Sequence, residues 1–168
     1  MTSSSPALSR IAVYSGTFDP VTLGHVDVVR RAAGLFDRII IAVAVAHHKK
    51  TLFNLEQRVA LAQAATNGIA GVSVLPFDGL LMDFCAAQNA CAVVRGIRNL
   101  TDFDYEAQMA AMNRKLRPQV ETVFILPDAS LQCISSTLVR EISKLGGDVC
   151  QMVNVEVLKA LNRAVKGA

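Results

Sequence analysis

The sequence contains little charge of either sign, no cluster of histidine or cysteine and no long apolar run. Charged residues make up 18% of the 168 residues, and the formal net charge is only +3. Nucleic-acid-binding proteins usually carry a basic stripe, often with interleaved aromatic residues, and this sequence has none. No apolar run reaches the roughly 18 residues of a membrane-spanning helix. We therefore expect neither nucleic acid nor a membrane among its partners.

The four cysteines and three histidines are scattered along the chain. The cysteines form no Cys-x-x-Cys pair, and the adjacent His47 and His48 lack the spacing of metal ligands, so structural zinc is not expected. Residues 1–9 are polar and lack the basic flank and apolar centre of a signal peptide, which predicts a flexible tail. These features predict a reduced, cytoplasmic protein.

Hydrophobic residues are abundant, at 52% of the chain. A chain of this length can bury on the order of 70% of its unfolded surface in one core. We expect Met109 and Met112, on one face of a predicted helix, to pack in that core. No linker, repeat or low-complexity segment divides the chain, so we predict a single domain over residues 1–168.

Apolar stretches alternate with helical patterns along the chain. Each stretch is rich in β-forming residues, and each is followed by apolar residues at spacings of three and four, which is typical of a helix. This alternation implies right-handed crossovers and a parallel sheet. We predict an α/β fold, a three-layer sandwich with a doubly wound five-stranded parallel sheet. The predicted strands are residues 11–14, 39–46, 72–77, 91–94 and 122–126.

Residues 15–25 join the first predicted strand to a helix. Gly16 can adopt backbone angles that larger residues resist, Thr22 can cap the helix, and Gly24 leaves its first turn bare of side chain. A helix start exposes unpaired N–H groups and a partial positive charge, which favour phosphate. His25 lies in that first turn and would point toward the anion. The segment therefore predicts a phosphate-binding loop.

In parallel sheets, ligands bind at the carboxyl ends of the strands. The loops after the first, second, fourth and fifth predicted strands bring cations and hydroxyl groups to this edge. Because four separate loops converge there, we predict a polyphosphate site. Its polar residues are Thr17, His25, Lys49, Lys50, Arg95, Arg98, Ser135, Ser136 and Thr137.

The same residues also fit ordinary structural roles. Arg95 and Arg98 follow a buried strand, where they could pair with Asp102 or Glu106. The hydroxyl groups of residues 135–137 could serve only to cap a helix. No single residue distinguishes these alternatives, and only their convergence favours a ligand site.

Four motifs occur in a fixed order between about Ile11 and Val165. They are GTFDPVTLGH from Gly16, a Lys-Lys loop, RGIRNLTDFDYE from Arg95 and ISSTLVRE from Ile134. The chain resembles the nucleotidyltransferase superfamily, which has a Rossmann-like fold, and within it the phosphopantetheine adenylyltransferase family. The TxGH tetrapeptide alone is shared across the superfamily, whereas the last two motifs are more specific.

The resemblance implies an enzyme that transfers the adenylyl group of ATP to 4'-phosphopantetheine. The products would be dephospho-coenzyme A and pyrophosphate, and the in-line attack would form no covalent enzyme intermediate. The resemblance also implies Mg2+ that enters with the nucleotide, assembly into a homohexamer and feedback by coenzyme A.

The resemblance further implies roles for individual residues. His25 would stabilise the transition state and, with Lys49 and Thr17, form the catalytic group. The phosphopantetheine site would contain Thr17, Lys49, Leu81 and Arg95. The ATP site would comprise Thr17, Phe18, His25, Gly96, Ile97, Arg98, Glu106, Leu131, Gln132, Cys133, Ile134, Ser135, Ser136 and Thr137.

The chain departs from common family residues at Ser15, Ala46, Leu131 and Cys133. The last two affect the expected adenine contacts. Ala46 lacks a hydroxyl group that would lie near the phosphate of phosphopantetheine.

The expected chemistry needs little beyond alignment and positive charge. A phosphate monoester has its second pKa near 6, so it is largely a dianion at neutral pH and needs no general base. The enzyme must align it with the α-phosphorus and stabilise charge on the transferred group and the leaving pyrophosphate. The alternatives are a superfamily enzyme with other substrates, such as CTP with glycerol phosphate, a non-catalytic nucleotide-binding module, and a structural protein.

Overall fold

A computed structural model describes residues 9–47 and 50–166 of the chain. The predicted strands form a single all-parallel sheet with the strand order β3-β2-β1-β4-β5, which confirms the predicted fold class. Most of the predicted tail and the predicted site residue Lys49 lie outside the described residues. The strands are β1 (Ile11–Gly16), β2 (Arg38–Ala44), β3 (Val72–Phe77), β4 (Ala92–Gly96) and β5 (Glu121–Ile125).

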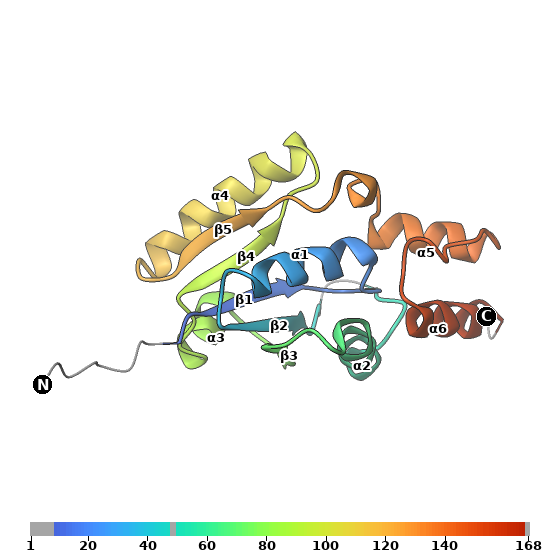
Figure 1. Cartoon of the computed structure of the whole chain (residues 1–168), viewed down its shortest axis with the longest axis horizontal. Coiled ribbons are helices and arrows are strands. Elements are labelled where there is room, and N and C mark those ends of the chain that lie inside the picture. The colour runs from blue at the N-terminus through green and yellow to red at the C-terminus, as the bar shows by residue number, and fades with distance from the viewer. Residues whose placement is uncertain (1–8, 48–49, 167–168) are drawn as a thin grey trace, which may run out of the picture.

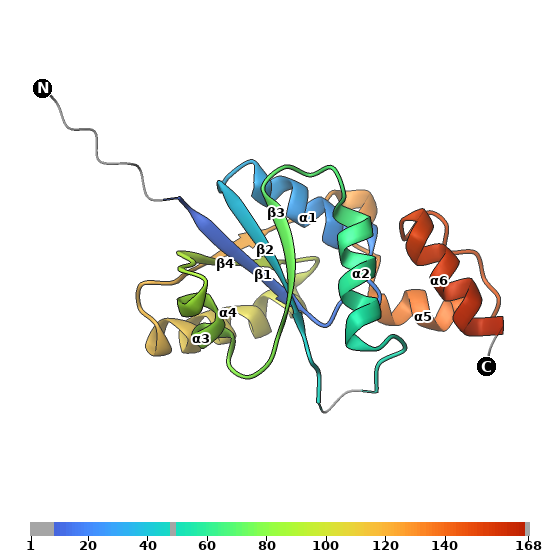
Figure 2. The same cartoon turned by 90° about the horizontal axis from the view of Figure 1, so that it is seen from below.

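Helices cover both faces of the sheet. In Figure 2, α1 and α2 lie on one face and α3 and α4 lie on the other. Two further helices, α5 and α6, lie beyond the arrowheads of the strands in Figure 1, at the edge where the ligand site is predicted. The helices are α1 (Leu23–Ala33), α2 (Leu55–Thr66), α3 (Leu81–Ala87), α4 (Leu100–Leu116), α5 (Ser136–Lys144) and α6 (Val155–Lys166), with a short 3-10 helix η1 (Ala129–Leu131) before α5.

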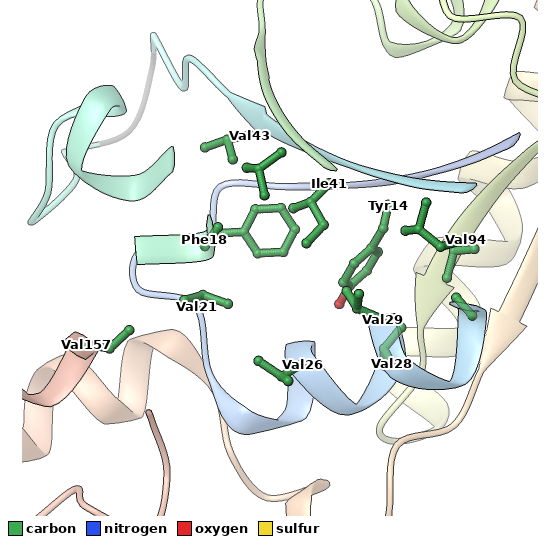
Figure 3. Packing of buried hydrophobic residues seen from close by; sticks show 14 of the residues in the cluster. Tyr14, Phe18, Val21, Val26, Val28, Val29, Ile41, Val43, Val94 and Val157 are labelled. Atoms are coloured by element: carbon green, nitrogen blue, oxygen red, sulfur yellow. The ribbon is translucent and has the colours of Figure 1, made fainter. Parts of the chain in front are cut away.

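The two faces of the sheet bury separate apolar clusters. Ile39, Ile41 and Val43 of β2 pack with α1 and α2, whereas Ile40 and Ala42 pack with α3. Successive side chains of a strand point to opposite faces, so a strand buried on both faces is apolar throughout. Figure 3 shows the first cluster, in which the rings of Tyr14 and Phe18 pack among valine and isoleucine side chains.

Side-chain caps determine where several helices begin. Thr22 caps α1, and Asn54 forms a capping box with Gln57 at the start of α2. Such caps satisfy backbone N–H groups that have no partner within the helix. Asn99 and Ser135 cap α4 and α5 in the same way. The predicted cap at Thr22 and the capping alternative for Ser135 are therefore confirmed.

The structure corrects three predicted strand ends. β1 does not stop at Tyr14, because Ser15 and Gly16 continue it by pairing with β2. β4 does not stop at Val94, because Arg95 and Gly96 continue the ladder by pairing with β5. β2 stops at Ala44, two residues earlier than predicted, and Ala46 beyond it has a left-handed backbone with φ 62°. That conformation is incompatible with an extended strand.

Gly16 has a different role from the predicted one. The left-handed backbone in this loop belongs to Phe18, with φ 50°. A Cβ atom on Gly16 would lie 3.1 Å from the Cζ atom of the Phe18 ring. Glycine at this position leaves space for the ring, which a larger residue would push aside by a few tenths of an ångström.

The strand order creates a switch point between β1 and β4. The chain moves outward from β1 through β2 to β3 and then returns to β4 on the other side of β1. The helices that follow β1 and β4 therefore lie on opposite faces, and the crevice between them is where such folds bind ligands. None of the helices within the described ranges has both the length and the apolar composition needed to cross a membrane.

Candidate active site

His25 is held at the start of α1 by its own capping box. The backbone N–H of Thr22 donates to the Nδ1 atom of His25 at 3.0 Å, and the backbone N–H of His25 faces the Thr22 hydroxyl at 3.5 Å. Because a backbone N–H can only donate, Nδ1 accepts, and the hydrogen of a neutral ring is on Nε2. The cap therefore orients a hydrogen-bond donor away from the helix.

The surroundings of His25 keep its ring neutral. The ring lies with its centroid 5.1 Å from the Phe18 ring, in an edge arrangement, and 6.3 Å from the Tyr14 ring. Burial, together with the positive charges of Arg98 and Arg95, lowers the pKa of His25 to about 4. At neutral pH His25 is therefore an uncharged donor through Nε2.

A cavity of about 50 Å³ lies beside His25 at the switch point. A Cβ atom on Gly96 would lie 3.1 Å from a methyl carbon of Val28, so glycine leaves room where β4 meets α1. The loops after β1, β4 and β5 all contribute to the cavity wall, as predicted for a shared site. Its lining residues are Tyr14, Thr22, Gly24, His25, Val28, Gly96, Arg98, Pro127 and Ile134.

Arg98 joins two of these loops. Its Nε atom donates to Asp102 at 2.9 Å, and its Nη1 atom is 3.4 Å from the backbone oxygen of Ile134. The pairing with Asp102 is the structural alternative considered from the sequence. Arg98 also lines the cavity, so the paired guanidinium still brings positive charge to it.

Arg95 is bound more tightly than Arg98. It forms two parallel hydrogen bonds with the Glu106 carboxylate, at 2.7 and 2.5 Å, and donates to the backbone oxygen and hydroxyl of Ser15 at 2.8 and 3.1 Å. Burial alone would lower the pKa of Arg95, but the Glu106 pair outweighs it and raises that pKa, so the guanidinium stays charged. Ser15, one of the departures from the family pattern, thus supplies an acceptor for Arg95.

A second hollow, a groove of about 370 Å³, lies beyond the loop after β1. Its wall carries two cations, Lys50 and Arg140, and several hydroxyl groups. The Ser136 hydroxyl donates to the backbone oxygen of Pro20 at 2.8 Å, which ties the start of α5 to this loop. The groove is lined by Thr17, Phe18, Asp19, Lys50, Thr51, Ser136, Thr137 and Arg140.

Most predicted site residues lie at these two hollows or next to them. The backbone oxygen of Leu131 would be 3.5 Å from a Cβ atom on Gly24, so η1 lies against the first turn of α1. Gln132 and Cys133 follow η1 on the way to the cavity, and the Cys133 side chain is exposed. Residues brought together by the cavity or groove are Thr17, Phe18, His25, Gly96, Arg98, Ile134, Ser136 and Thr137.

Other predicted residues have structural roles or lie elsewhere. Phe18 is 4% exposed, so its ring supports His25 and offers no surface for adenine. The buried Ile97 donates its backbone N–H to Ile125. Ser135 caps α5. Leu81 packs with the cluster on the opposite face of the sheet from His25, so the structure does not bring these two side chains together.

Sequence reasoning missed three polar residues at these loops. Arg140 lies in the ISSTLVRE motif, four residues after Ser136 and so on the same face of α5, which could have indicated it. Asp19 is 3% exposed and lies in the wall of the groove. Arg58 is buried in α2, and no pattern in the sequence separates it from an exposed helix arginine.

Comparison with known proteins identifies relatives of the chain. A family profile described as cytidylyltransferase-like matches residues 13–142. A phosphopantetheine adenylyltransferase from Acidovorax sp. (strain JS42) is 59% identical over 151 residues, which are 90% of this chain and 92% of the relative. Those from Azoarcus sp. (strain BH72) and Moorella thermoacetica are 51% and 47% identical, over 92% and 90% of this chain and 95% of each relative.

Solved structures share the fold at lower identity. A Vibrio parahaemolyticus protein, provisionally assigned as a nicotinate-nucleotide adenylyltransferase, has a TM-score of 0.68 and is 17% identical, covering 94% of this chain and 95% of its own. At this identity the likeness concerns the fold alone.

Proposed function

The chain belongs to the cytidylyltransferase-like family and, within it, to the phosphopantetheine adenylyltransferases, and we propose that it transfers the adenylyl group of ATP to 4'-phosphopantetheine. The products are dephospho-coenzyme A and pyrophosphate, which makes this a step of coenzyme A biosynthesis. The observation that carries the proposal is the convergence of the loops after β1, β4 and β5 on His25.

The acceptor phosphate attacks as a dianion. One of its oxygens forms a bond to the α-phosphorus of ATP while the bond from that phosphorus to the bridging oxygen breaks, and pyrophosphate leaves with the electron pair. Thr17 and Lys50 line the groove that would hold the attacking phosphate, and Lys49 precedes Lys50. Arg95 adds positive charge from the neighbouring strand. No covalent enzyme intermediate is required.

His25 supports the transition state as a hydrogen-bond donor. Negative charge builds up on the oxygens of the α-phosphate during transfer, and a fixed donor next to them lowers the barrier. The Thr22 cap directs the hydrogen of His25 away from Nδ1, so Nε2 is the donor. Bound nucleotide phosphates would raise the pKa of His25, but Nε2 carries a hydrogen in both protonation states.

We assign the leaving pyrophosphate to the α5 side of the groove and the attacking phosphate to the side of Thr17 and Lys50, because in-line attack needs them on opposite sides of the α-phosphorus. Ser136 and Thr137 open α5, where the helix start favours anions. Arg140 extends from the same helix into the groove and adds a fixed positive charge. We assign the β- and γ-phosphates of ATP to this side and the adenosine to the side of Ile134 and residues 131–133.

Mg2+ is proposed to enter on the ATP phosphates. This ion prefers oxygen ligands and commonly binds through phosphates with a few protein oxygens. The groove offers such oxygens in the hydroxyl groups of Thr17, Ser136 and Thr137. When bound, the ion neutralises charge on the phosphates. The described part of the chain has no cluster of three or more acidic, histidine or cysteine side chains.

The exposed face of α4 supports assembly into a homo-oligomer. Contrary to the sequence prediction, Met109 and Met112 are not core residues, and α4 as described has no buried residue. Large contiguous apolar patches on soluble proteins mark interaction sites. We propose that other copies of this chain cover this face in a homohexamer. The exposed side chains on this face are Tyr105, Met109, Met112 and Leu116, which recur at spacings of three and four.

Two further properties are proposed from the family. Coenzyme A resembles the product, so we expect it to bind the site and inhibit. We also place the enzyme in the cytoplasm, which is supported by four cysteines that are all free thiols.

An activity assay tests the proposed function. The protein is incubated with ATP, Mg2+ and 4'-phosphopantetheine, and dephospho-coenzyme A and pyrophosphate are measured by chromatography. Equimolar formation of both products is expected. Turnover with CTP and glycerol phosphate, or with ATP and a mononucleotide, but not with phosphopantetheine, would replace the proposed substrate pair. No turnover with any pair would favour a binding module.

A further inference from the structure

Arg58 is an arginine enclosed in the protein. It lies in the first turn of α2 and is 1% exposed. All its hydrogen bonds go to backbone oxygens, and they connect three segments of the chain. Its side chain donates to Thr17 at 2.8 Å, Ala44 at 2.7 Å, Val45 at 3.3 Å and Phe53 at 3.1 Å.

Asp19 also links the loops that Arg58 connects. Its carboxylate accepts the backbone N–H groups of Leu52 and Phe53 at 2.8 and 2.9 Å. Its backbone oxygen accepts a hydrogen bond from Arg140, whose Nη1 atom is 3.6 Å from the carboxylate. The loop after β1 is therefore linked to the loop after β2 in two ways. Arg58 donates to backbone oxygens, and Asp19 accepts backbone N–H groups.

The contacts of Arg58 and Asp19 hold two loops that carry predicted substrate-binding residues. Thr17 lies in the first loop, and Lys50 lies between Val45 and Leu52 in the second. The second loop turns immediately after the Arg58 contacts, at Ala46, whose left-handed backbone conformation is unfavourable for alanine. A structural partner is needed to hold such a turn in one conformation.

Stability alone is a weak reason for this arrangement. A buried charge is costly to desolvate, and apolar side chains of similar volume often stabilise a fold at least as well. The guanidinium group instead offers several donors in a rigid planar fork, which suits the simultaneous orientation of several carbonyl groups. Arg58 therefore contributes by orienting these carbonyl groups rather than by stabilising the fold.

We propose that Arg58 is a positioning residue for the acceptor substrate. It fixes Thr17 and the Lys50 loop relative to each other, so that the phosphate of phosphopantetheine is aligned with the α-phosphorus held at His25. Arg58 contacts neither reacting group. This inference rests on the proposed function.

The test compares Arg58→Lys and Arg58→Met with the wild-type enzyme. A misplacement of about 1 Å at a reacting group can lower the rate about 100-fold. We expect kcat/KM for phosphopantetheine to fall about 100-fold in Arg58→Met and by less in Arg58→Lys, which keeps the charge but not the fork. The Kd for ATP, measured by calorimetry without phosphopantetheine, should change by less than about threefold, because none of the residues that Arg58 bonds lines the cavity.

Val120→Ala is the matched control. Val120 is buried at the amino end of β5, remote from both loops, and its truncation should lower the Tm without changing the KM for phosphopantetheine. If Arg58→Met does not fold, Asp19→Asn weakens the same link from the other side. It should raise the KM for phosphopantetheine more than the Kd for ATP.

Two outcomes would overturn the inference. One is an unchanged kcat/KM for phosphopantetheine in Arg58→Lys and Asp19→Asn. The other is a parallel loss of ATP and phosphopantetheine binding that follows the fall in Tm, as in a purely structural role. A wild-type enzyme that forms no dephospho-coenzyme A would instead refute the proposed function, so the two failures are distinguishable.

Discussion

The cavity beside His25 and the groove beside Thr17 differ in how they present positive charge. Arg98 lines the cavity and is already paired with Asp102, whereas Arg95, paired with Glu106, lies outside the cavity lining. In the groove, Lys50 and Arg140 line a hollow several times larger, about 370 Å³ against about 50 Å³, and Arg140 pairs only at the longer distance of 3.6 Å, with the Asp19 carboxylate. The cavity therefore suits the negative charge that forms only in the transition state. The groove is large enough to bind and release pyrophosphate.

The largest expected effect lies in the cavity, at His25. His25→Ala removes the Nε2 donor, and we expect kcat to fall by about 100-fold or more, roughly 3 kcal/mol of transition-state stabilisation. The Kd for ATP, measured by calorimetry, should change far less. His47→Ala, in an exposed histidine, is the control. If ATP affinity and kcat fell equally, His25 would act in ATP binding and not specifically in the transition state.

The next effect is expected in the groove. Arg140→Met removes a cation that we assign to the pyrophosphate, and a hydrogen bond to a charged group contributes about 1.5–3 kcal/mol. The Kd for pyrophosphate, measured by calorimetry, should therefore rise by about 10- to 100-fold, while that for AMP stays unchanged. Arg163→Met, on the surface of α6, is the control. If the Kd for AMP rose by a similar factor, Arg140 would act by holding Asp19 in place and not by binding pyrophosphate.

A smaller effect is expected from filling the cavity. In Gly96→Ala the new Cβ atom would lie 3.1 Å from Val28, and such overpacking destabilises by about 1–3 kcal/mol. Urea unfolding should show this loss, and the KM for ATP should rise severalfold. Adding Val28→Ala should recover part of both. If the double variant is no better than Gly96→Ala, space beside Val28 is not the reason for the glycine.

The smallest expected effect is the pH dependence of stability that comes from the titration of His25. NMR titration of the free enzyme should give His25 a midpoint near the pKa of about 4, with a downward shift caused first by burial and then by Arg98 and Arg95. Since an unfolded histidine titrates near 6.5, the unfolded state takes up a proton first as the pH falls. The His25 contribution to stability is therefore complete above about pH 6.5 and is lost between about 6.5 and 4. A midpoint near 6.5 would show that burial and the two arginines do not lower the pKa of His25.

Much of the fold was predictable because its signals are local. The β3 limits, the cap at Thr22 and the cap at the start of α5 depend on neighbouring residues, and all three were correct. The strand ends at Ala44 and Gly96 were not, because one depends on a left-handed turn and the other on pairing with β5. Gly16 was assigned the wrong role, since the clash that requires glycine comes from the ring of Phe18.

The candidate site was predictable in its residues but not in their arrangement. Motifs placed Thr17, His25 and Arg98 at strand ends, and the structure brings the loops that carry them together. Their hydrogen-bond partners could not be ranked, because Arg95 could pair with either nearby carboxylate. Arg58 carried no signal, since its importance lies in carbonyl groups on other segments.

By itself, the sequence determined the order of strands and helices, most helix starts and the residue types at each strand end. These depend on hydrophobic period and capping, which act over a few residues. Only the tertiary structure decided that β4 lies beside β1, that Arg95 reaches Ser15 across 80 residues and that His25 is neutral. Those properties depend on burial and on contacts between distant segments, which arise only when the chain has folded.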